Sequence, residues 1–239
     1  MIRKRVLVTL VAAPAMCLVT FGGAVLADNR DGALAAHMHE HWERISEIQA
    51  ALIRGDLAAV REPARYLAEH PTPASLPAQW EEHVSAMREA ATAVAGAQDF
   101  SAAASATALM GAACGGCHTA VAVDVEFEPG DAPDYGADAK SHMIRHQWAA
   151  DRMWEGIIGP SEPAWASGID ALLEAPLTVQ ELHGEKAGAE RVTQMARRIH
   201  QLAGNGMMAS GGQEKAQIYG EFLANCADCH TAVADGPGK

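Results

Sequence analysis

One eight-residue pattern occurs twice in the sequence, and it constrains the chain more than any other feature. It reads C-G-G-C-H-T-A-V over residues 114–121 and C-A-D-C-H-T-A-V over residues 226–233. Each copy is a C-x-x-C-H motif, the attachment signature of a c-type haem. Two thiols bond to the vinyl groups of one porphyrin, and the adjoining histidine gives an imidazole nitrogen to the iron. The predicted attachment residues are Cys114, Cys117 and His118, and Cys226, Cys229 and His230.

The spacing suits this chemistry. Positions i, i+3 and i+4 share one face of a helix, so two sulfurs and an imidazole on a helix point the same way. A C-x-x-C disulfide, a redox-active pair or half of a zinc site are the alternatives for one copy. Two copies, each followed by Thr-Ala-Val, favour haem. The sequence therefore predicts two covalently bound haem c groups.

The N-terminus predicts export. Arg3, Lys4 and Arg5 precede an apolar run over residues 6–26, and a small-residue cleavage site precedes Asp28. This is the pattern of a secretory signal peptide over residues 1–27, with an uncleaved membrane anchor as the alternative. After cleavage, all remaining cysteines belong to the two motifs. We expect a periplasmic protein with no stable membrane anchor.

The charge of the chain is strongly acidic. The formal charge is −12, and residues 1–27 hold three positive charges and no acid, so the mature chain reaches −15. Such a surface argues against binding nucleic acid or anionic lipid, and suits steering towards a redox partner with a basic docking patch. Solubility alone is the alternative reason for the acidity.

The sequence contains an internal repeat, in which residues 37–41 (H-M-H-E-H) match residues 142–146 (H-M-I-R-H). We predict a first haem-binding module over residues 28–120, an acidic linker over 121–137 and a second module over 138–239. Helix-forming composition and Gly or Pro breaks predict an all-α fold with four helices in each module. The expected helices lie near residues 33–54, 57–70, 77–96 and 100–119, and near 138–157, 161–175, 178–203 and 213–232.

The first helix of each module has an apolar stripe that a histidine interrupts, at His41 and at His146. In an antiparallel up-down-up-down bundle, the start of the first helix lies level with the end of the fourth. We therefore predict His41 and His146 as sixth iron ligands, with Met38 and Met143 as alternatives. His37 and His142 form i, i+4 pairs with them, which leaves a weak zinc site open. The remaining histidines have no repeat partner and are expected at the surface or hydrogen-bonded in the core; they are His70, His83, His183 and His200.

The position of the motif within each module indicates the type of cytochrome. Only nine residues follow His230, and none is Met or His, so a downstream ligand is excluded for the second motif. The chain resembles the family of cytochromes c′ and c556, in which the haem motif ends the last helix of an antiparallel four-helix bundle. The resemblance implies two tandem bundles, and it keeps Met38 and Met143 open as ligands because the c556 proteins use a methionine on the first helix.

With both axial positions filled, iron has no open site for a substrate. We therefore expect an electron carrier or relay rather than an enzyme. Two alternatives require one five-coordinate iron: a peroxidase-like haem enzyme, and a gas-binding cytochrome as the cytochromes c′ suggest.

Overall fold

The computed structural model describes residues 21–72, 76–127, 130–134, 136, 138–174 and 189–234. These residues form helices and contain no β-strand, so the predicted all-α class is confirmed. In chain order the helices are α1 (Phe21–Ile53), α2 (Arg61–Glu69), the short 3-10 helix η1 (Ala78–Trp80), α3 (Glu81–Gly96), α4 (Phe100–Ala120), α5 (Ala139–Ile158), α6 (Glu162–Glu174), α7 (Ala189–Gly206) and α8 (Gly212–Ala234).

The chain divides into two compact units, residues 1–37 and residues 38–239. The described part of the first unit is the N-terminal portion of α1. Both C-x-x-C-H motifs and the helices from α2 onward belong to the second unit. The two predicted modules therefore do not appear as separate compact bodies.

Helix α4, which carries the first motif, and helix α5, which follows it in the chain, begin with the same local chemistry. Asp99 precedes α4, and its side chain accepts a hydrogen bond from the Ala102 N–H at 2.7 Å. Asp138 precedes α5, and its side chain accepts from the Ser141 N–H at 3.0 Å. An Asp in this position satisfies an N–H group that the helix itself leaves unpaired, which fixes where the helix starts.

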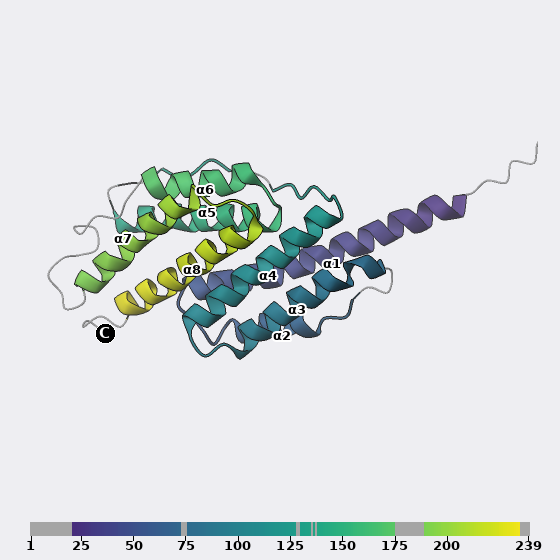
Figure 1. Cartoon of the computed structure of the whole chain (residues 1–239), viewed down its shortest axis with the longest axis horizontal. Helices are drawn as coiled ribbons and strands as arrows, with labels where there is room; N and C mark the ends of the chain where they lie inside the picture. The colour runs from purple at the N-terminus through teal and green to yellow at the C-terminus, as the bar shows by residue number, and fades with distance from the viewer. Residues whose placement is uncertain are drawn as a thin grey trace, which may run out of the picture. The chain divides into compact units, whose positions relative to one another are not determined.

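Helices consecutive in sequence pack on one another in the second unit (Figure 1). In the second repeat α5 contacts α6, α6 contacts α7, α7 contacts α8, and α8 contacts α5. In the first repeat α2 contacts α3, and α3 contacts α4. The repeats also contact each other, because α4 lies along α8 and packs on α5.

One apolar core runs through both repeats. Its largest fully buried side chains include Trp154, Tyr219 and Phe222, together with Ile48 and Leu52 of α1. The Trp154 and Tyr219 rings are stacked, with centroids 5.3 Å apart. Helix α4 has the length and hydropathy of a membrane span, but its buried residues form part of this core.

The predicted helices differ from the observed ones mainly at their ends. Helix α1 begins at Phe21 rather than near residue 33, and so continues through the predicted cleavage point after Ala27. Helix α2 begins at Arg61 because residues 56–60 form turns, in which the Asp56 side chain accepts from the Ala59 N–H at 3.0 Å. Of the helix expected over 178–203, residues 178–188 lie outside the described part, and α7 covers the rest.

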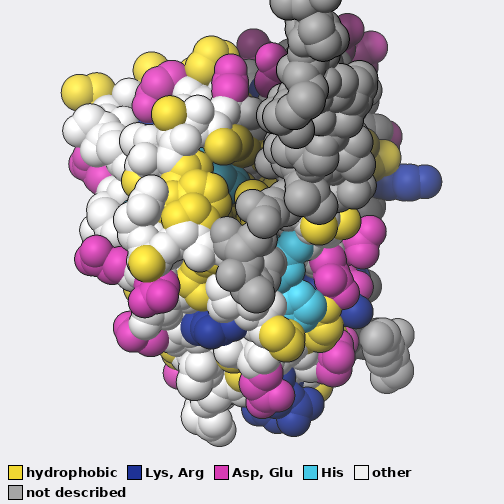
Figure 2. Space-filling view, turned by 90° about the vertical axis from the view of Figure 1, so that its right-hand side faces the viewer, with side chains coloured by type: hydrophobic (Ala, Val, Ile, Leu, Met, Phe, Trp, Pro, Cys, Tyr) yellow, Lys and Arg dark blue, Asp and Glu magenta, His cyan; other side chains and the backbone are white. Residues whose placement is uncertain are grey.

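Acidic side chains are scattered over the face of the molecule drawn in Figure 2, with basic and apolar side chains between them. The part of the linker that the structure describes, residues 121–127, 130–134 and 136, contains no helix. Phe127 of this segment packs against Trp42 of α1, with ring centroids 5.0 Å apart. The linker, which is itself part of the second unit, thus packs on α1 at this point.

Candidate functional site

Both C-x-x-C-H motifs lie inside long helices, the first in α4 and the second in α8. The cysteines and histidine of each motif therefore share one helix face. All four cysteines in the described part of the chain are free thiols. Burial raises the pKa of both Cys114 and Cys226 to about 12. A redox-active cysteine pair needs a thiol with a lowered pKa, so these environments argue against that alternative.

A cavity of about 370 Å³ opens beside the second motif. Cys226, Cys229 and His230 of α8 form one side of it, and His146 and Met143 of α5 form another. The rest of the lining is largely apolar and comes from α1, α5, α7 and α8, including Ile53, Ala150, Met195, Ala196 and Ile199. The structure thus brings His146 and the second motif, 80 residues apart in sequence, to the same apolar space.

His146 is the unusual group of this cavity. Its side chain is buried, with 8% of the residue exposed, and its Nε2 atom makes no hydrogen bond. Burial, followed by the nearby His200 and His142, lowers the pKa of His146 to about 4. The ring is therefore neutral near pH 7, which is the form in which imidazole binds a metal. A buried polar atom without a partner is costly, so its presence at a cavity needs an explanation.

Met143 lines the same cavity as His146, so both predicted sixth ligands of the second motif face one space. Met143 differs because a thioether is buried without a hydrogen-bond partner at little cost. The first repeat is different: Met38 is 39% exposed. The two methionines that match in sequence therefore occupy different environments.

His41 lies in a polar cluster of the first repeat. Its ring meets the ring of His70 edge-on, with centroids 5.5 Å apart. His70 in turn stacks on Tyr66 at 4.6 Å, and the Tyr66 hydroxyl donates to Glu40. The prediction that His70 is a surface or simple core group misses this role as a neighbour of His41. His37 belongs to the other compact unit.

The histidine of each motif is held by a backbone carbonyl. Nδ1 of His118 lies 2.8 Å from the carbonyl oxygen of Ile158. Nδ1 of His230 is hydrogen-bonded to the carbonyl oxygen of Ile53. A carbonyl can only accept, so each Nδ1 carries a proton, and Nε2 is the nitrogen that can bind a metal in the neutral ring. Sequence reasoning could not identify these acceptors, because any residue type supplies a carbonyl.

His200 of α7 does not line the cavity, but it lies close enough to His146 to help lower the pKa of that residue. His200 is half-buried, and its buried Nε2 atom makes no hydrogen bond within the described part of the protein. Burial lowers the pKa of His200. A sequence signal existed: position 200 borders the stripe of buried residues Val192, Ala196, Ile199 and Ala203. The missing repeat partner concealed it.

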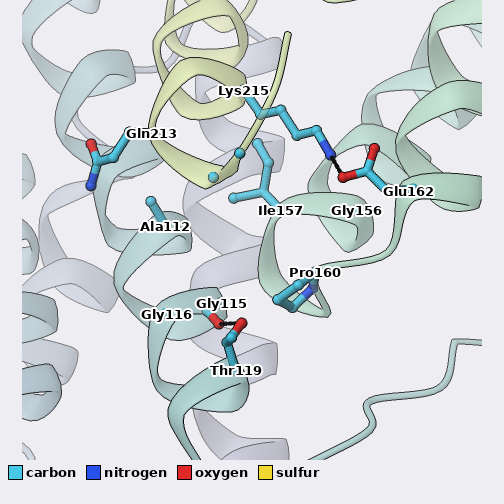
Figure 3. A pocket seen from close by; sticks show the side chains of 12 residues that line it. Ala112, Gly115, Gly116, Thr119, Gly156, Ile157, Pro160, Glu162, Gln213 and Lys215 are labelled. Carbon is cyan, nitrogen blue, oxygen red and sulfur yellow. Dashed lines mark hydrogen bonds and ion pairs between the residues drawn. The ribbon is translucent and has the colours of Figure 1, made fainter. Parts of the chain in front are cut away.

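A second cavity of about 370 Å³ lies beside α4, the helix that carries the first motif (Figure 3). It is lined by Gly115, Gly116 and Thr119 rather than by the motif's cysteines. Lys215 reaches across it to Glu162, with Nζ and Oε1 2.5 Å apart. Because this buried lysine is already paired and no cysteine lines the cavity, we do not assign the cavity to the attachment site.

Comparison with protein-family models, with curated proteins and with solved structures gives no match to this chain. The assignment of a function therefore depends on the residues themselves.

Proposed function

We propose that this chain is an exported, periplasmic dihaem c-type cytochrome that carries or relays electrons. The observation that carries the proposal is the cavity of the second repeat. There Cys226, Cys229, His230 and His146, whose buried Nε2 has no partner, face one apolar space. Two thiols, a histidine with its Nδ1 engaged and a second neutral histidine are a donor set that fits a covalently held, six-coordinate haem.

The residues have separate roles in this proposal. Cys226 and Cys229 would hold the group through thioether bonds, and His230 would bind iron through Nε2. His146 would be the second histidine ligand of the iron, which would give its buried Nε2 a partner. The group itself supplies a one-electron change at iron when bound. The largely apolar lining would limit the access of water to the bound group, which favours electron transfer over reactions with substrates.

The first site is proposed by the repeat. Cys114, Cys117 and His118 repeat the spacing of the second motif, and His118 shows the same Nδ1 hydrogen bond to a helix-end carbonyl. His41 is the proposed sixth ligand, with Met38 as the alternative, as Met143 is for His146. The proposed modules span residues 28–120 and 138–239, joined by the segment 121–137.

We also propose that each module is an antiparallel four-helix bundle of the cytochrome c′ type. Support comes from the second repeat, where the contacts of α5, α6, α7 and α8 form a closed ring. The motif-bearing helix is the last of the four in both repeats. This arrangement is the one that the family resemblance implies.

Mass spectrometry of the exported protein tests the proposal. The expected mass is that of the chain from Asp28 to Lys239 plus two haem groups, because both motifs are complete. The full chain with Cys226→Ala and Cys229→Ala is the matched control and should carry one haem. A wild-type mass without haem would overturn the proposed function, and a mass that retains residues 1–27 would overturn only the predicted cleavage.

A second candidate function is favoured by the first repeat. His41 packs against the ring of His70, and Met38 is 39% exposed, whereas His146 lines the cavity of its own motif. An iron without a sixth ligand there would bind a gas or a peroxide. The absorption spectrum of the reduced protein with added CO decides: a CO complex at the first haem supports this function, and its absence supports electron transfer.

A further inference from the structure

We propose that the proximal histidine of each haem is positioned by the other repeat, so that the two redox centres are built reciprocally. His230 of the second repeat is held by the end of α1, and His118 of the first repeat by the end of α5. Ile53 and Ile158, whose carbonyls accept these bonds, are the last residues of their helices. This inference rests on the proposed function, because it assigns a consequence for the haems.

The end of α1 shows why one carbonyl is available. The Gly55 N–H donates to the Leu52 carbonyl, and the Asp56 N–H donates to the Ala51 carbonyl, both at 2.9 Å. This is a Schellman ending, which satisfies two of the carbonyls that a helix leaves unpaired. The carbonyl of Ile53 comes next and receives the Nδ1 proton of His230.

The end of α5 repeats the arrangement with different bonds. The Gly159 N–H donates to the Glu155 carbonyl at 2.8 Å, and the Ser161 N–H donates to the Gly156 carbonyl at 3.1 Å. Residue 160 is a proline and has no N–H to donate. The carbonyl of Ile158 accepts from His118 Nδ1. Both repeats therefore use the terminal carbonyl of the first helix for the histidine of the other repeat.

Glycines allow the helices to approach closely enough for these bonds. A Cβ atom on Gly55 would lie 2.6 Å from Thr231 Oγ1 and 3.1 Å from the Ala227 carbonyl oxygen. Gly55 also has a φ of +74°, which side chains other than glycine rarely adopt. A Cβ atom on Gly115 would lie 2.2 Å from the Ile157 carbonyl oxygen. The contact of α1 with α8 thus mirrors that of α5 with α4.

The hydrogen bond has a predictable electronic effect. An Nδ1–H that donates to a carbonyl makes the imidazole a stronger donor through Nε2, and it fixes the ring orientation. A stronger donor stabilises oxidised iron and lowers the reduction potential. Loosening the end of α1 should therefore raise the potential of the second haem and leave the first haem unchanged.

The test uses Gly55→Ala in two full-length chains that each carry one haem. With C114A/C117A only the second haem attaches, and with C226A/C229A only the first. Potentiometric titration should show that Gly55→Ala shifts the midpoint upward in the first of these chains and not in the second. Gly96→Ala, at a position with no heavy atom within 4 Å of the added Cβ, is the matched control and should shift neither.

The paired variant Gly55→Ala with Thr231→Ala separates positioning from general destabilisation. Removing Thr231 Oγ1 removes the closest clash of the new Cβ, so the shift should shrink towards the wild-type value. Equal shifts of both haems, or no shift of the second haem in Gly55→Ala, would overturn the proposal.

A measurement on the unmodified sequence is independent of whether Gly55→Ala folds. In ¹⁵N-histidine NMR spectra, the Nδ1–H protons of His118 and His230 should exchange with solvent far more slowly than the N–H protons of the exposed His39. This spectrum can be recorded on the full chain with or without haem. Fast exchange at His230 overturns the inference, whereas a protected proton in a chain that attaches no haem overturns only the proposed function.

Discussion

At the scale of single residues, burial distinguishes candidates that the sequence presents as equals. His41 and His146 occupy the same register in the repeat, and both were predicted as ligands from an interrupted apolar stripe. His146 lines a cavity together with the cysteines and the histidine of its motif, whereas His41 packs against the ring of His70. The polar cluster around His41 depends on Tyr66 of α2 and on His70, which directly follows α2, and a long-range contact of this kind leaves no pattern in the sequence.

We predict that His146→Ala opens the second haem and that Met143→Ala does not. The buried Nε2 of His146 has no hydrogen bond, whereas a methionine needs none, so the histidine is the group whose burial requires iron. In the full chain with C114A/C117A, the reduced spectrum of His146→Ala should become high-spin and respond to CO. The same spectrum for Met143→Ala should remain low-spin and unresponsive.

The reverse result, with CO binding only after Met143→Ala, would assign the methionine as ligand. A response in neither variant would assign the position to another donor, and His200, with its unpaired Nε2, is then the first to substitute. The pair His41→Ala and Met38→Ala in the C226A/C229A chain asks the same question of the first haem.

Much of the site could be predicted from sequence because its chemistry depends on side chains at fixed spacing. The amino-acid sequence alone predicts the two motifs and their placement on the last helix of each repeat. The sequence does not predict which groups accept hydrogen bonds from the motif histidines, namely the carbonyls of Ile53 and Ile158. They depend on where two helices end relative to two others, which is a property of packing.

At the scale of helices, glycine sets how closely α5 and α6 pack. A Cβ atom on Gly156 would lie 2.6 Å from the Trp165 backbone nitrogen and 2.9 Å from its Cα. Both atoms belong to the backbone of α6, so neither can move unless the helix moves. The contact therefore requires glycine at position 156, although glycine is a poor helix former.

We predict that Gly156→Ala lowers the free energy of unfolding by ~1–3 kcal/mol, as overpacking does elsewhere. Gly204→Ala in α7 is the matched control, because its added Cβ meets no heavy atom within 4 Å. There alanine should raise the free energy of unfolding by roughly 0.5–1 kcal/mol through helix propensity alone. Urea unfolding followed by circular dichroism measures both, and changes of the same sign would contradict this account of α5 and α6.

At the scale of the whole molecule, a buried polar network joins the repeats. Gln49 of α1 donates through Nε2 to the Tyr219 hydroxyl at 2.8 Å and to Asp151 at 3.1 Å. The Tyr219 hydroxyl donates to the Ala150 carbonyl at 3.1 Å. The network ties α1, α5 and α8 together beside the stacked Trp154 and Tyr219 rings. Residues 38–239 thus behave as one compact unit although the sequence reads as two modules.

We predict that Tyr219→Phe lowers the free energy of unfolding by ~1–3 kcal/mol, because it removes two buried hydrogen bonds of the Tyr219 hydroxyl, one from Gln49 and one to the Ala150 carbonyl. Tyr66→Phe is the control: its hydroxyl also donates, to Glu40, but Tyr66 is only half-buried and water can replace the bond. Chemical unfolding of the two variants should therefore give a larger loss for Tyr219. Equal losses would mean that the network contributes no more than a solvent-accessible bond.

The charge of the whole chain leads to the last prediction, that salt slows electron transfer to a basic partner. The full chain has a formal charge of −12, which would become −15 on loss of residues 1–27, and acidic side chains are scattered over the face in Figure 2. Steering by such a field raises association rates by roughly 10-fold or more, and it decays over about 30 Å at 0.01 M salt but only about 8 Å at 0.15 M. Stopped-flow reduction of a basic acceptor should slow steeply across this range. Reduction of an uncharged quinone by the same protein should not, because no field acts on it. If both rates were independent of salt, the acidity would serve solubility and the partner would dock by contacts other than charge.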